Sequence, residues 1–159
     1  MAARNTLALR TALWLTLGGW VGSWAFFALV IARIAFRVLP SPEIAGHLVR
    51  PLLNTLHWYG AIAGLALAAL AVALQRGRLL VGLPLVLAAA CLVTQLGVTP
   101  RLEAIRDLAF GAGGNVAATA QYRHLHALSM VIFTGVLVGV IGLLVLHVRR
   151  EHPDDTGRR

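Results

Sequence analysis

The stretch PLLNTLHWYGAIAGLALAALAVALQ, residues 51–75, decides the fold because it contains no Asp, Glu, Lys or Arg. A helix needs roughly 20 mostly apolar residues to cross the hydrocarbon core of a bilayer. Within lipid the backbone must satisfy its own hydrogen bonds, so an apolar run of this length forms a helix. The sequence therefore predicts a membrane-spanning helix here.

Three further uncharged runs have the same character: residues 11–32, 79–100 and 126–148. The 159 residues are 58% hydrophobic and only 13% charged, whereas a soluble domain carries about a quarter charged residues. The first run is longer than the apolar core of a cleaved signal peptide, so we expect it to be a retained helix. We predict an all-α fold, a four-helix transmembrane bundle in one domain (residues 1–148), followed by a disordered polar tail (149–159).

The net charge of +8 comes from 14 basic residues, all of them Arg. They lie at the ends of the apolar runs rather than in one patch, which argues against a nucleic-acid partner. With four spans, eight arginines fall on the side of both termini and six on the other side. The positive-inside rule therefore favours cytoplasmic termini, and we expect a multi-pass protein of the bacterial inner membrane.

The longest connection lies between the third and fourth runs. Its first part, RLEAIRDL (101–108), has a helical pattern that extends the third span, and Gly111–Asn115 (GAGGN) should end that helix.

Polar residues collect at the end of the bundle that carries the connections at 33–50 and 99–126. This end has four of the six histidines, namely His47, His57, His124 and His126. The opposite end has short connections and is predicted to be plain. Any chemistry is therefore expected at the end with the first and third connections.

Helical phase selects two of these histidines. His57 shares a stripe with Asn54, Gly60 and Gly64, and His126 shares one with Ser129, Met130 and Phe133 at i, i+3, i+4 and i+7. We expect His57 and His126 to face one interior.

An ionisable residue inside a span is a candidate functional site, and neutral imidazole binds heme iron and metal ions. The competing interpretation is that each histidine only makes an interhelical hydrogen bond. The candidate cofactor-binding residues are His57, His126, Asn54, Ser129, Arg33 and Arg101. The candidate metal ligands are His57, His126 and Met130. The possible cofactors are heme b or a transition metal; otherwise none is expected.

No nucleophile with an orienting acid is evident, so a non-enzymatic protein is the favoured expectation. Glycine pairs at helix-packing spacing, Gly18/Gly22, Gly60/Gly64 and Gly135/Gly139, predict close helix contacts. Besides the lipid bilayer, they favour a homo-oligomer or a partner membrane subunit. An accessory subunit or assembly factor without its own cofactor is the alternative function.

Three segments carry a family resemblance: FRVLPSPEIAGHLVRPLLNTLHWYGAIAG (36–64), VTPRLEAIRD (98–107) and YRHLHALSMVIFTGVLVGVIGLL (122–144). In this order they resemble the transmembrane-protein-205-like family, which is distantly similar to CopD-type copper-resistance proteins and HemJ-type protoporphyrinogen oxidases. Pro100, Arg101, His126 and Ser129 lie on its motif positions. In those relatives membrane histidines are associated with copper or heme, so the resemblance implies such a site. It also adds a third alternative, a HemJ-like membrane redox enzyme.

Overall fold

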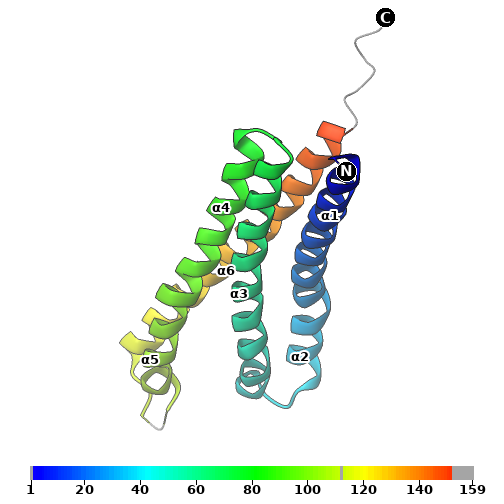
Figure 1. Ribbon diagram of the computed structural model, residues 1–159. Coiled ribbons are helices and arrows are strands. Elements are labelled where there is room, and N and C mark those ends of the chain that lie inside the picture. Colours follow the sequence, from blue (N-terminus) through cyan, green and yellow to red (C-terminus); the bar gives the residue numbers. More distant parts are fainter. Residues whose placement is uncertain (1, 112, 152–159) are drawn as a thin grey trace, which may run out of the picture.

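The computed structural model describes residues 2–111 and 113–151 and consists there of four long helical rods without strands, which confirms the predicted all-α four-helix fold (Figure 1). The first rod joins α1 (Ala2–Phe26), the π-helical turn η1 (Phe27–Ile31) and α2 (Ala32–Val38). The second is α3 (Pro42–Ala73). The third joins α4 (Arg78–Val93), the π-helical turn η2 (Thr94–Val98) and α5 (Thr99–Phe110), and the fourth is α6 (Val116–Glu151).

Each rod is long and apolar enough to cross a membrane. The rods exceed the predicted spans because 32 to 36 residues at 1.5 Å each reach about 50 Å, against a hydrocarbon core of about 30 Å. Residues 149–151, predicted as the start of a disordered tail, continue α6. The rest of that predicted tail, 152–159, lies outside the described residues.

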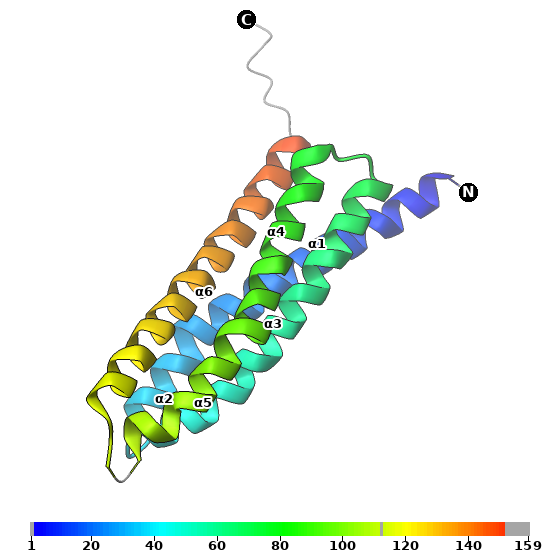
Figure 2. The same ribbon diagram turned by 90° about the vertical axis from the view of Figure 1, so that its left-hand side faces the viewer.

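The bundle has two ends of different composition. The terminal end holds the start of α1, the α3–α4 turn and the end of α6 (Figure 1). The loop end holds the connections 39–41 and 111–115 (Figure 2).

Local sequence explains the helix boundaries. Ser41 caps α3 by accepting a hydrogen bond from the amide of Ile44 at 3.4 Å. The extension of the third span ends at Phe110, as the glycines at 111, 113 and 114 predict. Asn115 then accepts from the amide of Ala117 at 2.8 Å and so caps α6. The α3–α4 turn needs a glycine, because Gly77 has a φ of +93°.

The core is built from stripes at alternating spacings of three and four residues, which keep one helix face turned to its neighbours. The buried residues on the first rod are Leu13, Leu17, Trp20 and Trp24 of α1 and Phe27 of η1, and those on α6 are Phe133, Val136, Val140, Leu143 and His147. The helix α3 packs closely against α4 and also against α1, and α6 packs against α4, α5 and α1.

Candidate functional site

The side chain of His57 is buried in the core, with 3% of its surface exposed. Its Nδ1 lies 2.7 Å from the carbonyl oxygen of Leu53, so this nitrogen carries the proton and donates. Its Nε2 is buried and has no hydrogen-bond partner among the described residues. The prediction that His57 faces the interior is confirmed.

An aromatic ring packs against this imidazole and continues into a chain of rings. Trp24 meets it edge-on with ring centroids 5.5 Å apart. On its other side Trp24 stacks on Phe133 at 4.5 Å, and Phe27 packs against Phe133 at 5.8 Å. Trp24 on α1 therefore links His57 on α3 to Phe133 on α6.

The turn η2 lies at the same level as His57. A Cβ added at Gly60 would lie 2.8 Å from Cys91 Sγ, and a Cβ added at Gly64 would lie 2.8 Å from Ala88 Cβ. These glycines of α3 therefore face these residues of α4. This antiparallel register, extended by one turn, places His57 at the level of Thr94 and Gln95. Thr94 is fully buried, and its hydroxyl donates to the carbonyl of Ala90 at 3.0 Å.

We call Trp20, Trp24, His57 and Gln95 the interior cluster, because each has a buried polar side-chain atom that lacks a hydrogen-bond partner within the described chain. The two indole N–H groups are donors, whereas His57 Nε2 and Gln95 Oε1 are acceptors. A buried polar atom without a partner costs about 1–3 kcal/mol. π-helical turns such as η1 and η2 are frequent at functional sites.

The structure does not bring His126 to His57. His126 is exposed and stacks on Tyr122 at 6.2 Å, so the prediction that it faces the interior is wrong. Its helical phase is that of Phe133, but α2 and α6 are not among the packed helix pairs, and they diverge at the loop end (Figure 1). The face that is covered at Phe133 is therefore open at His126.

Asn54 is also exposed, which corrects its predicted inward position. At this level Val49 and Leu53 face the neighbouring helices, and Asn54 follows Leu53 by one residue, about 100° further round the helix. Among the other candidates, Ser129 is half-buried, whereas Arg33, Arg101 and Met130 are exposed. No group of three or more His, Cys, Asp or Glu side chains forms a metal site within the described residues.

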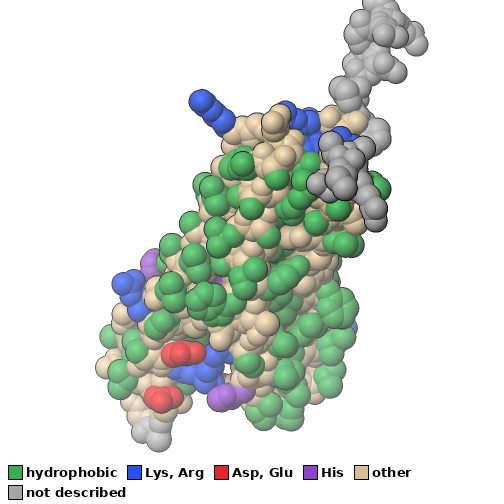
Figure 3. Space-filling model, in the orientation of Figure 1, with side chains coloured by type: hydrophobic (Ala, Val, Ile, Leu, Met, Phe, Trp, Pro, Cys, Tyr) green, Lys and Arg blue, Asp and Glu red, His purple; other side chains and the backbone are tan. Residues whose placement is uncertain are grey.

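The loop end does gather charges, as predicted. Arg106 on α5 donates to His47 Nε2 on α3 at 3.0 Å. In the view of Figure 3 acidic, basic and histidine side chains lie together at this end. These contacts are exposed and resemble a solvated surface network.

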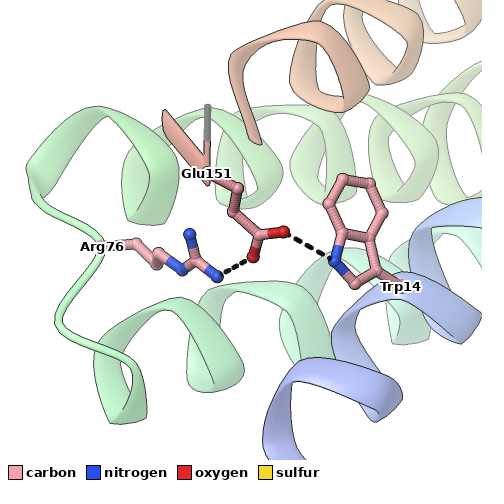
Figure 4. A network of polar contacts seen from close by, with 3 residues as sticks. All are labelled: Trp14, Arg76 and Glu151. Atoms are coloured by element: carbon pink, nitrogen blue, oxygen red, sulfur yellow. Dashed lines mark hydrogen bonds and ion pairs between the residues drawn. The ribbon is translucent and has the colours of Figure 1, made fainter. Parts of the chain in front are cut away.

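The terminal end is not plain, contrary to the sequence-based prediction. Arg76 in the α3–α4 turn forms an ion pair with Glu151 at the end of α6. Trp14 Nε1 on α1 donates to the second carboxylate oxygen at 3.3 Å (Figure 4). His147 is 2% exposed and lies 6.3 Å from the Trp14 ring. The sequence carried one signal for this site, because His147 and Glu151 are four residues apart and so share one helix face.

A comparison with known families gives one match. The model of the family described as domain of unknown function DUF4149 matches residues 15–111. The matched segment contains His57, Trp20, Trp24 and Gln95, whereas α6 lies beyond it. No curated protein and no solved structure matches the chain. Because the match spans more than half of its length, the chain belongs to the DUF4149 family.

Proposed function

We propose that this multi-pass membrane protein holds a cofactor at His57, and that heme b is the best-supported ligand. The observation that carries the proposal is the state of the imidazole. Its Nδ1–H is fixed by the carbonyl of Leu53, and its Nε2 lone pair is free. Metal-ligating histidines have this arrangement, because the second hydrogen bond fixes the tautomer and the ring orientation.

The donor set favours heme over a bare metal ion. A structural zinc site, for example, takes four protein ligands, and the described residues group no three His, Cys, Asp or Glu. Heme iron takes four nitrogens from its own ring and needs one or two from the protein. His57 supplies one. When bound, heme b would supply one-electron redox chemistry.

Access to the site depends on Trp24. Its ring covers His57 on one side and stacks on Phe133 on the other. A porphyrin enters only if this stack separates. The surrounding aromatic side chains then offer apolar surface for the ring, and the indole N–H groups of the interior cluster offer donors for its polar substituents.

A visible spectrum tests the proposal. The protein is purified in mild detergent from heme-replete cells, and its Soret absorbance and bound metals are measured. We expect a Soret band that is lost in His57→Leu and kept in His124→Leu, which changes an exposed histidine. A heme-replete preparation with neither a Soret band nor a bound metal would refute the proposal.

A second function, an accessory subunit of a larger membrane complex, is favoured by one observation. Gly18 and Gly22 on α1 are exposed, and nothing lies within 4 Å of a Cβ added at either. Such a face lets another helix approach closely. The partner could also be a second copy of the chain. The HemJ-like enzyme stays a prediction from the resemblance.

Co-purification tests whether the α1 glycine face binds another membrane helix. Gly18→Val with Gly22→Val should abolish an association that survives mild extraction. Gly142→Val is the matched control, because its Cβ also meets nothing within 4 Å. Recovery of the wild type as a lone monomer in native lipid would contradict the accessory role.

A further inference from the structure

The strongest unexplained feature of the fold is an arginine-lined recess at the terminal end. It has a volume of about 350 Å³ and adjoins a second recess of about 250 Å³. Both are lined by Arg76 and Arg150; Arg10 lines the first and Arg78 the second. The first volume lies within the range of small-molecule sites.

The recess has a buried floor at Arg76, whereas Arg10, Arg78 and Arg150 at its edges are exposed. Arg76 is 7% exposed and is held by Glu151, which Trp14 in turn holds (Figure 4). Arg150 reaches over the α3–α4 turn, since a Cβ at Gly77 would lie 2.9 Å from its guanidinium. These cations are therefore positioned by contacts from α1, α6 and the α3–α4 turn.

The charges in the recess do not balance. Glu151 is the one acidic side chain that acts there in the described chain, and Arg76 already pairs with it. Arg10, Arg78 and Arg150 form no ion pair within residues 2–111 and 113–151. On the face drawn in Figure 3 the described side chains at this end include basic but no acidic ones. Among the described residues, the guanidinium groups of Arg10, Arg78 and Arg150 are therefore not held by an ion pair and are available to an anion.

The walls of the recess are amphipathic. Leu9, Ala73 and Leu74 line it together with the arginines. It lies at the ends of apolar helices, where lipid headgroups would come into contact with it. Basic pockets between membrane helices bind phosphate-bearing headgroups, and Arg matches phosphate oxygens with paired donors.

We propose that this recess binds the phosphate of an anionic phospholipid, with Arg10 and Arg150 as its ligands and Leu9 and Leu74 against the lipid chains, while the Arg76–Glu151 pair forms the floor. The site is separate from His57 and from the proposed heme. Interfacial arginines that merely reach toward water are the competing explanation. They predict no difference between arginines at the two ends of the bundle.

Native mass spectrometry of the full-length protein in nanodiscs tests the proposal. The probes are phosphatidylglycerol in a phosphatidylcholine background and, separately, inorganic phosphate. The recess variant carries both substitutions, Arg10→Gln and Arg150→Gln. The matched control, Arg33→Gln with Arg37→Gln, removes the same charge at the loop end, where both residues are exposed.

We expect the wild type and the control to retain phosphatidylglycerol and the recess variant to retain it at least about 10-fold less, because losing a hydrogen bond to a charged group weakens binding by roughly that factor or more. If the wild type retains inorganic phosphate as well as phosphatidylglycerol, and the recess variant retains neither, the site binds phosphate in general rather than the lipid. Equal retention by the recess variant and the control would overturn the proposal, and so would equal retention of the zwitterionic lipid.

Discussion

The guanidinium of Arg76 and the carboxylate of Glu151 form an ion pair that joins the α3–α4 turn to the last described residue of α6. The side chain of Arg76 is 8% exposed and that of Glu151 is 23% exposed. Trp14 adds α1 to the same network. All four helical rods are therefore linked at the terminal end, next to the arginine-lined recess.

Replacement of Glu151 by Gln should lower the free energy of unfolding by about 1–3 kcal/mol. This lies between the value of less than about 1 kcal/mol for exposed pairs and roughly 3–5 kcal/mol for breaking a fully buried pair. Unfolding in detergent measures it. The control is Arg149→Gln, because Arg149 is exposed on the same turn. If both variants unfold alike, the ion pair has no stabilising role.

The two glycine pairs on α1 and α3 should respond differently to the same substitution. A Cβ at Gly64 would lie 2.7 Å from the carbonyl oxygen of Pro84, so Gly64→Ala should cost about 1–3 kcal/mol through overpacking. Gly18 has open space. Gly18→Ala should therefore leave stability unchanged or raise it by up to about 1 kcal/mol, because Ala favours the helix.

Thermal unfolding of the monomer measures this contrast. A Gly64→Ala variant as stable as the wild type would show that α3 and α4 can separate at no cost, contrary to the packing described. A loss of stability in Gly18→Ala would mean that the α1 face is covered in the purified protein.

The sequence predicted the number and type of the helices because lipid leaves the backbone few alternatives. It also predicted the inward phase of His57, since Gly60 and Gly64 follow it at helical spacing, although Asn54 of the same stripe is exposed. Helical phase gave the wrong result for His126. Its side chain lies on the same helix face as Phe133, but no neighbouring helix covers that face at the level of His126. The Arg76–Glu151 pair could not be inferred, because its two residues are 75 positions apart and meet only once four helices have packed.

The single cysteine offers a direct check of the core. Cys91 is fully buried, and its sulfur faces Gly60 on α3. A maleimide should not label it in the folded protein and should label it completely after denaturation in detergent. The control is Gln75→Cys in a Cys91→Ala background, because Gln75 is exposed in the α3–α4 turn. Rapid labelling of Cys91 in the folded state would contradict the α3–α4 register, and with it the level assigned to Gln95.

Two substitutions of His57 distinguish a structural role of its side chain from a functional one. In a continuous α3 the carbonyl of Leu53 also accepts from the backbone amide of residue 57, so this oxygen keeps a partner when the imidazole is removed. His57→Leu deletes a buried nitrogen without a hydrogen-bond partner and keeps most of the side-chain volume. We expect its unfolding free energy, measured without ligand, to equal or exceed that of the wild type, because replacing an unpaired polar group by an apolar one of similar shape is neutral or stabilising. His57→Ala, which leaves a cavity, should lower the free energy of unfolding by about 2–4 kcal/mol.

A destabilised His57→Leu would mean that the imidazole serves packing. A stable His57→Leu that no longer binds heme would mean that the histidine is kept for its free nitrogen, because stability is commonly traded for function at such sites.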